Sequence, residues 1–332
     1  MKPEAGRGPL WAAALIGASL VFPFFTSSQY VLNILILVGI HIILAASNRL
    51  ILRMGVWFLG HAAFYAFGVY SVLLARDFLG LSYWSSLPLA GLTAGLMALG
   101  LGYATARVKG VPFCIITVAL VEVVRLAIVR LGGGRPVKCA PPEALLGLDF
   151  SSKVHYYYLI LVLVLFSLHV LHRVERSRFG RNIVAMAESE SLAESMGINT
   201  VRHRVLVMSL CCFMAGLAGG FFAPYVRVVG YTTFTLTTSI VILIYVVVGG
   251  ARSLWGPVVG AAFLTILPEF LPGRAAIQNI LYAAIVLASL FFLPGGLISL
   301  PEVVRSGKLT TLPGLLRKRA GAVKDAGRSG HA

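Results

Sequence analysis

The sequence predicts an all-α protein, a polytopic membrane bundle of about ten transmembrane helices (eight to ten). Hydrophobic residues occupy 58% of the 332 positions and charged residues only 12%, whereas an ordinary soluble domain has about 25% charged residues. The mean hydropathy is +0.88, and apolar runs recur along nearly the whole chain. Such a chain cannot cover a water-soluble surface, which excludes the soluble fold classes.

Ten apolar segments are predicted to cross the bilayer, each with about the twenty residues that a helix needs, or fewer where it is tilted. They are residues 10–26, 30–48, 56–75, 86–105, 112–130, 156–172, 205–225, 236–250, 256–272 and 276–294. Residues 1–300 therefore form one predicted transmembrane domain. Residues 301–332 are basic with little apolar content, so we expect a disordered cytoplasmic tail near anionic headgroups.

The distribution of positive charge gives the expected orientation, with both termini in the cytoplasm. With ten spans and the N-terminus inside, the inner segments carry 20 of the 28 Lys and Arg residues and the outer segments carry 7. Arg125, inside the fifth span, is the remaining one. This asymmetry agrees with the positive-inside rule, and it places residues 172–204 in the cytoplasm.

Glycines four residues apart predict close packing between the helices. They occur in "GLTAG" (91–95), "GLAGG" (216–220) and "GPVVG" (256–260). Small residues at this spacing let helix backbones approach, where packing replaces a hydrophobic driving force.

Several function classes are disfavoured. The net charge of +16 is explained by the inner loops, and no basic stretch interleaves with aromatic residues as in a nucleic-acid platform. The four cysteines lack metal-site spacing, and no catalytic motif or phosphate-binding loop is present. We expect no metal, no cofactor and no enzymatic activity, so any ATP must be hydrolysed by another subunit.

Charged residues inside a membrane span are costly and therefore indicate function or pairing. Glu122 and Arg125 lie three residues apart in the fifth span, so they share a helix face and can pair. Two interpretations stay open at this point, a structural ion pair or side chains that line a substrate path.

His61 follows Gly60 in the apolar run "GVWFLGHAAFYAFGVYSVLLA". It is either a hydrogen-bonded interior residue or part of a pathway. Gly55, Gly60 and Gly68 permit a bent or broken helix, which is tolerated in a membrane only beside protein or a wet cavity. The candidates for the translocation pathway are His61, Tyr65, Thr117, Glu122 and Arg125.

A short charged segment interrupts the apolar chain within residues 172–204. It predicts a helix from Asn182 to Met196 that Gly197 ends in a left-handed conformation. A quarter of all acidic residues lie in it, namely Glu188, Glu190 and Glu194. The helix either docks another protein or lies on the membrane surface. Anionic lipid headgroups would repel the three glutamates, so the charge of the helix favours docking to a protein.

The chain resembles the M-type permease subunits of bacterial ATP-binding-cassette importers for branched-chain amino acids. Four segments carry the resemblance: "GHAAFYAFGVY" (60–70), "GVPFCIITVALVEVVR" (110–125), "SRFGRNIVAMAESESLAESMGIN" (177–199) and "SLWGPVVGAAFLTILPEFL" (253–271). They occur in family order, and the similarity extends over residues 30–297. The segment 177–199 is the most specific of them.

The resemblance implies half of a heterodimeric translocation pathway in the bacterial inner membrane. Its expected partners are a second related permease, two cytosolic ATPase subunits and a periplasmic or extracellular solute-binding protein. Residues 177–200 would sit in a cleft of an ATPase and couple ATP hydrolysis to transport. The residues implied in coupling are Arg178, Gly180, Arg181, Glu188, Glu190, Glu194 and Gly197.

The substrate stays open between branched-chain amino acids and related small molecules such as urea, short amides or carboxylated aromatics. The alternative function is an ion-coupled secondary transporter or a channel that acts alone and uses Glu122, Arg125 and His61. Such a carrier needs no docking helix, so residues 177–200 argue against it.

Overall fold

The computed structural model describes residues 28–105, 108, 110–131, 135–143, 152–270, 280–281, 283–287 and 296–299. The long helices are α2 (Gln29–Arg53), α3 (His61–Asp77), α4 (Tyr83–Thr105), α5 (Val111–Leu131), α6 (Lys153–Arg176) and α9 (Thr200–Val226). The shorter helices are α7 (Arg178–Glu188), α8 (Glu190–Ser195), α10 (Leu236–Gly249) and α11 (Trp255–Ile266). Two short strands, β1 (Val137–Lys138) and β2 (Val228–Val229), pair antiparallel. Three 3-10 turns are η1 (Tyr231–Thr233), η2 (Leu267–Phe270) and η3 (Leu297–Ser299).

The predicted fold class is confirmed. Six described segments are long and apolar enough to cross a membrane: Gln29–Arg53, Tyr83–Thr105, Val111–Arg130, Lys153–Arg176, Thr200–Val226 and Tyr231–Gly249. Every predicted span from 30–48 to 256–272 overlaps a described helix. The span 10–26, most of 276–294 and the tail 301–332 lie outside the described residues, so the total of ten spans stays a prediction.

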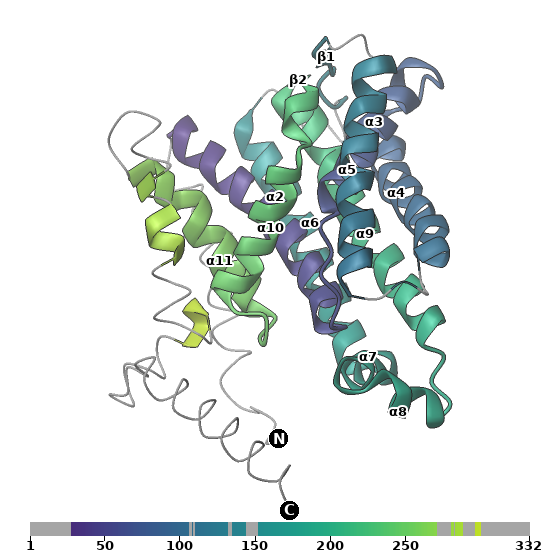
Figure 1. Ribbon diagram of the computed structural model, residues 1–332. Helices are drawn as coiled ribbons and strands as arrows, with labels where there is room; N and C mark the ends of the chain where they lie inside the picture. Colours follow the sequence, from purple (N-terminus) through teal and green to yellow (C-terminus); the bar gives the residue numbers. More distant parts are fainter. Residues whose placement is uncertain are drawn as a thin grey trace, which may run out of the picture.

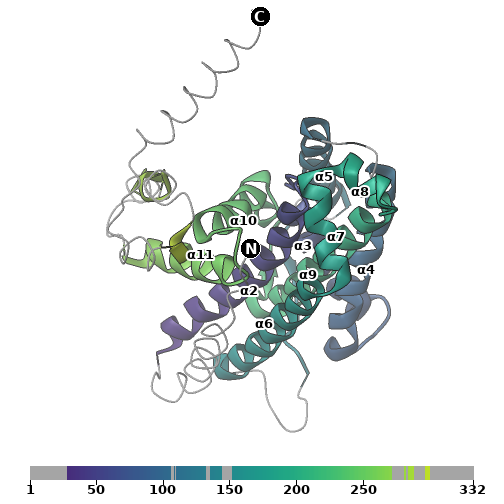
Figure 2. The same ribbon diagram turned by 90° about the horizontal axis from the view of Figure 1, so that it is seen from below.

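The bundle has two distinct ends. Figures 1 and 2 show α7 and α8 together at one end, and Figure 1 shows β1 and β2 at the other. The carboxyl ends of α2 and α6 meet beside α7, because Arg53 pairs with Glu175 at 3.1 Å. Segments that the charge distribution assigns to one side thus lie at one end of the bundle. We call the end with α7 and α8 the coupling end; its cytoplasmic location stays a prediction.

The helices approach closely where glycine was expected to allow it. A Cβ on Gly216 of α9 would overlap the carbonyl oxygen of Ala90 in α4, and one on Gly219 would overlap that of Tyr65 in α3. In the same way, a Cβ on Gly260 of α11 would overlap the carbonyl oxygen of Tyr245 in α10. Glycine at these positions lets α9 pack backbone to backbone against α3 and α4.

The chain between α2 and α3 is broken, as the glycines of that run allow. Residues 54–60 are not helical, Gly55 has a φ of +79°, and α3 begins at His61. The predicted span 56–75 is therefore shorter as a helix than expected. Conversely, α2 continues past the predicted end of its span, residue 48, to Arg53.

The expectation of one continuous helix from Asn182 to Met196 is wrong. Two helices form, because Ser189 adopts an extended conformation (φ −157°, ψ 108°) and caps α8 by accepting a hydrogen bond from the Leu192 amide. The expected end is confirmed: Gly197 has a φ of +82°. The amides of Gly197 and Ile198 donate to the carbonyls of Glu194 and Ala193, the pattern of a Schellman motif.

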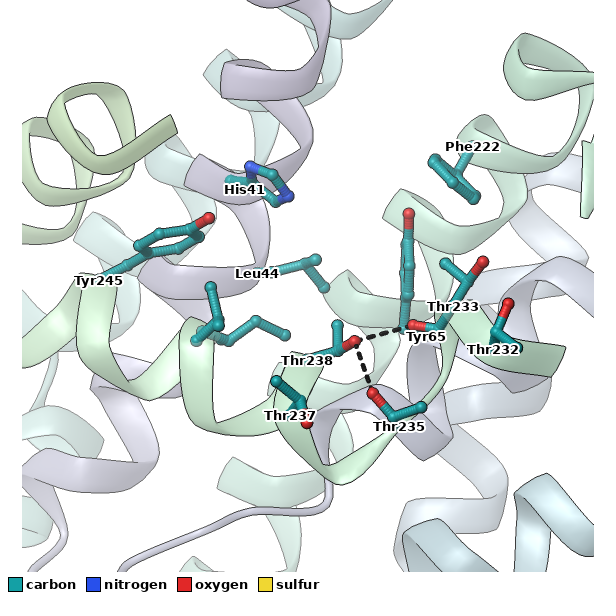
Figure 3. Close-up of a pocket in the computed structure, with 12 residues that line it drawn as sticks. His41, Leu44, Tyr65, Phe222, Thr232, Thr233, Thr235, Thr237, Thr238 and Tyr245 are labelled. Carbon is teal, nitrogen blue, oxygen red and sulfur yellow. Dashed lines mark hydrogen bonds between the residues drawn. The ribbon is translucent and has the colours of Figure 1, made fainter. Parts of the chain in front are cut away.

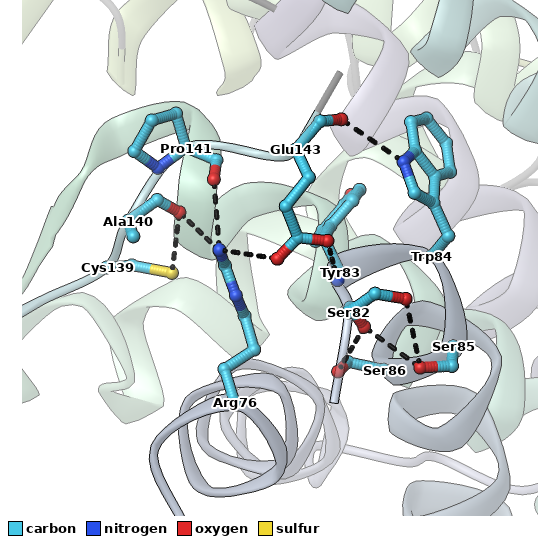
Figure 4. A network of polar contacts seen from close by, with 10 residues as sticks. All are labelled: Arg76, Ser82, Tyr83, Trp84, Ser85, Ser86, Cys139, Ala140, Pro141 and Glu143. Carbon is cyan, nitrogen blue, oxygen red and sulfur yellow. Dashed lines mark hydrogen bonds and ion pairs between the residues drawn. The ribbon is translucent and has the colours of Figure 1, made fainter. Parts of the chain in front are cut away.

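The opposite end is closed by a polar network (Figure 4). The guanidinium of Arg76, at the end of α3, donates to the carbonyl oxygens of Ala140 and Pro141 at 2.6 and 3.1 Å. It also pairs with Glu143 at 3.2 Å, and the Glu143 carboxylate accepts a hydrogen bond from the Tyr83 amide at 3.0 Å. Arg76 therefore fastens residues 139–143 onto the ends of α3 and α4.

Candidate coupling and translocation sites

The first helix of the coupling segment is joined to α6 by a tight turn. Ser177 ends α6 and caps α7, since its hydroxyl oxygen accepts a hydrogen bond from the Gly180 amide at 3.3 Å. Gly180 is buried, and a Cβ there would overlap the carbonyl oxygens of Val174 and Glu175. Backbone cannot yield as a flexible side chain can, so this turn requires glycine at position 180.

A histidine on α9 holds α7 in place. The His203 ring stacks on Phe179 with centroids 4.8 Å apart and an interplanar angle of 15°. Its Nδ1 lies 2.8 Å from the carbonyl oxygen of Asn199, which can only accept, so Nδ1 carries the proton. Nε2 then accepts from the Asn182 amide nitrogen at 3.1 Å.

Two of the three predicted coupling glutamates attach α8 to the start of α9. Glu190 pairs with the buried guanidinium of Arg204 at 3.1 Å. Glu194 accepts a hydrogen bond from the Thr200 hydroxyl at 2.7 Å, although the residue is exposed. Glu188 is exposed at the end of α7. Glu190 and Glu194 thus hold α8 against α9, and Glu188 contributes negative charge to the surface of the segment.

The outward surface of the coupling segment combines basic and apolar side chains. Arg178 and Arg181 are exposed on the first turn of α7. Leu192 is 62% exposed and Met196 is 77% exposed, whereas Ile183 and Met186 face the bundle and are buried. Large exposed apolar side chains outside the predicted spans make this surface a candidate for contact with another protein.

A buried ion cluster lies directly behind the coupling segment, and sequence reasoning missed it. Arg49, only 1% exposed, pairs with Glu175 near the end of α6, and Arg53 binds the other carboxylate oxygen. Arg49 Nε also donates to the Ala251 carbonyl at 2.8 Å, and an Nη donates to the Arg252 carbonyl at 3.2 Å. The cluster therefore joins α2, α6 and the turn between α10 and α11.

His61 and Thr117 both take part in hydrogen bonds near the start of α3. His61 is fully buried, and its Nε2 lies 3.1 Å from the Ser47 hydroxyl. Thr117 accepts from the Leu59 amide at 3.3 Å, and Ser239 accepts from the Ala62 amide at 3.1 Å. Side chains of α5 and α10 thus satisfy amides at the start of α3. His61 itself is bonded only through Nε2, because its buried Nδ1 has no hydrogen-bond partner among the described residues, so both interpretations of His61 stay open.

Glu122 and Arg125 form the predicted ion pair, with 2.8 Å between Oε2 and Nε. Their side chains are 42% and 28% exposed, so within this chain they do not lie in the core. α5 is the least buried of the six long apolar segments. A charged pair on a membrane helix needs protein or water beside it, which makes this face of α5 a candidate for contact with a partner or a pathway.

Tyr65 lines a cavity of about 360 Å³ between α2, α3, α9 and α10 (Figure 3). It is the only predicted pathway residue that does so. The cavity is lined by His41, Leu44, Tyr65, Phe222, Thr232, Thr233, Thr235, Thr237, Thr238, Val241, Ile242 and Tyr245. The five threonines between positions 232 and 238 are a concentration of hydroxyl groups beside an apolar span, a local signal in the sequence for a polar site.

Comparisons with known proteins identify the family. The model of the family described as the permease component of branched-chain amino acid transport systems matches residues 30–293. The chain belongs to this family. The resemblance recognised in the four sequence segments is therefore confirmed, and this chain is a permease component with several membrane-spanning helices.

Two curated relatives carry the same printed name, high-affinity branched-chain amino acid transport system permease protein LivM. They come from Salmonella typhimurium (strain LT2) and Escherichia coli (strain K12). Each is 28% identical to this chain over 317 residues, which cover 87% of this chain and 74% of the relative. No solved structure matches the chain significantly.

Proposed function

We propose that the chain forms half of the translocation pathway of an ATP-driven importer for branched-chain amino acids or related small molecules. It would act in the bacterial inner membrane with a second related permease, two cytosolic ATPase subunits and a solute-binding protein. The family and the names of both relatives support the substrate class. Arg178, Gly180, Arg181, Glu188, Glu190, Glu194 and Gly197 build or present the coupling unit.

One observation carries the coupling role. The α7–α8 unit is fixed by the Gly180 turn and by His203, yet it presents Leu192 and Met196 outward. A rigid unit moves as a whole when a partner displaces it, so a displacement of α7 and α8 is passed to the helices attached to them. An ATPase that receives these side chains in a cleft would therefore move the ends of α6 and α9 with them.

The test is Leu192→Lys in the complete transporter, reconstituted in proteoliposomes with its ATPases and binding protein. Leu192 is exposed, so the chain should still insert and fold, while a lysine ammonium opposes burial in an apolar cleft. We expect at least a tenfold loss of ATP-driven uptake and loss of ATPase subunits during co-purification.

The matched control is Phe78→Lys, which replaces an apolar side chain that is 81% exposed at the opposite end of the bundle. It should retain ATPase binding. Normal uptake by the Leu192→Lys variant would refute the coupling role. Ion-driven uptake by the isolated chain would refute the proposed function itself and favour a secondary transporter.

A further inference from the structure

The cavity beside Tyr65 lies at a broken membrane segment. Residues Tyr231–Gly249 are long and apolar enough to span a bilayer, but η1 ends at Thr233 and α10 begins only at Leu236. Irregular backbone at membrane depth is tolerated where it is buried in protein or lines a wet cavity. Thr235 from this break and Thr232 and Thr233 from η1 line the cavity.

The depth of the cavity fits a transport site. His41 is the middle residue of α2, so the cavity lies about half-way along a helix that is long enough to cross the membrane. In transporters, substrates bind near the midplane where a discontinuous helix presents its amino-terminal end. The first turn of α10 borders the cavity through Thr235, Thr237 and Thr238.

Polar groups in the cavity have open bonding capacity. Tyr65 is only 4% exposed, and its hydroxyl has no hydrogen-bond partner among the residues that the structure describes. Figure 3 shows its ring standing between Leu44 and Phe222. The side chain of the cap residue Thr235 accepts no bond from the backbone amides of α10, and its hydroxyl lies 3.4 Å from that of Thr238. Buried polar groups are normally paired, so the buried hydroxyl of Tyr65 points to a ligand in the cavity.

The lining also defines the chemistry of that ligand. The described lining residues include no charged side chain, which disfavours a ligand with net charge. The amino-terminal end of α10 and its threonine hydroxyls suit a carboxylate, and the rings of Tyr65, Phe222 and Tyr245 suit an ammonium group. Leu44, Val241 and Ile242 supply an aliphatic wall.

We propose that this chain itself binds the zwitterion of an aliphatic α-amino acid in the cavity beside Tyr65. The site rests on the proposed function, since it would be a station on the import pathway. Tyr65 and the threonines near the start of α10 contact the polar groups of the amino acid, and its side chain packs against α2 and α10.

The experiment measures L-leucine binding to the purified full-length chain in lipid nanodiscs by saturation-transfer NMR. Val241→Trp fills the cavity and should weaken binding at least tenfold. Tyr65→Phe removes one hydrogen bond and should weaken it about three- to tenfold. The control Ile240→Trp alters the neighbouring side chain, which is 40% exposed and does not line the cavity, and should change binding less than twofold.

Three results would overturn the site: no leucine binding by the wild-type chain, unchanged binding by Val241→Trp, or equal affinity for L-glutamate and L-leucine. Uptake by the reconstituted transporter separates this proposal from the proposed function. Wild-type leucine uptake that Val241→Trp leaves intact would overturn the cavity site alone. Leucine binding without ATP-driven uptake by the wild-type transporter would overturn the proposed function and leave the site standing.

Discussion

Removal of the Glu175 carboxylate should destabilise the bundle more than any other single charge change at the coupling end. Arg49 is 1% exposed and Glu175 is 11% exposed, so water cannot replace the lost partner. Breaking a buried ion pair in this way costs about 3–5 kcal/mol. Arg49 keeps its bonds to the carbonyls of Ala251 and Arg252. We therefore expect Glu175→Ala to lower the free energy of unfolding by about 3 kcal/mol, the lower end of that range.

The assay is reversible unfolding of the purified chain in mixed detergent micelles, followed by circular dichroism. Arg49→Met combined with Glu175→Ala should lose less stability than the sum of the two single variants, because the double variant leaves no unpaired buried charge. Glu188→Ala is the control, since Glu188 is exposed at the end of α7 and its removal should change the free energy of unfolding by at most about 0.5 kcal/mol. A loss below about 1 kcal/mol for Glu175→Ala, or strict additivity, would refute the reasoning.

Two further predictions concern the opposite end and the helix contacts. Burial raises the pKa of the Cys139 thiol, and the nearby Arg76 guanidinium offsets part of this rise. Because the thiolate is the reactive form, Cys139 in the folded chain should react slowly with maleimide at neutral pH. Arg76→Ala releases the clamp on residues 139–143, and Cys139 should label several-fold faster; an unchanged labelling rate would contradict the clamp. Gly219→Leu should cost about 3 kcal/mol or prevent folding, because its side chain would meet the backbone of α3. Gly100→Leu should be tolerated, since a Cβ there has nothing within 4 Å, and equal losses for both glycine variants would show that the α3–α9 contact is not tight.

Apolar length and local spacing were enough to predict the helices and several contacts. The spacing of three between Glu122 and Arg125 predicted their pair, since a helix fixes that geometry locally. Gly197 was predicted as a helix end for the same reason, because the conformation belongs to one residue. The break at Ser189 was missed, although a serine three residues before Leu192 is itself a local capping signal.

Contacts between residues far apart in the chain could not be predicted. The predicted span 30–48 ends before Arg49, but the structure places Arg49 inside α2 against Glu175, which lies 126 positions later. The amides at the start of α3 are bound by Thr117 and Ser239, and nothing in the sequence near His61 indicates these partners. The cavity forms where four helices meet. The run of threonines is therefore visible in the sequence, but its position in a cavity depends on the packing of the helices.

Contacts run from the coupling segment to both walls of the cavity. Gly55, in the break before α3, lies against Ala187 of α7, and the break leads directly to His61. Tyr65 follows one turn later on the same helix. On the other side, Glu175 binds Arg49, which donates to the carbonyl of Ala251 in the turn that follows α10.

These two routes start from neighbouring points on α6 and α7 and end on facing helices. The first reaches α3, which carries Tyr65, and the second reaches α10, which carries Val241 and Tyr245. Helices are rigid along their length, so a displacement of the coupling segment would change the separation of α3 and α10 instead of dissipating at the surface. We therefore expect the cavity between these two walls to change its shape when the coupling segment moves. An amino acid bound there would therefore be held or released according to the position of α7 and α8.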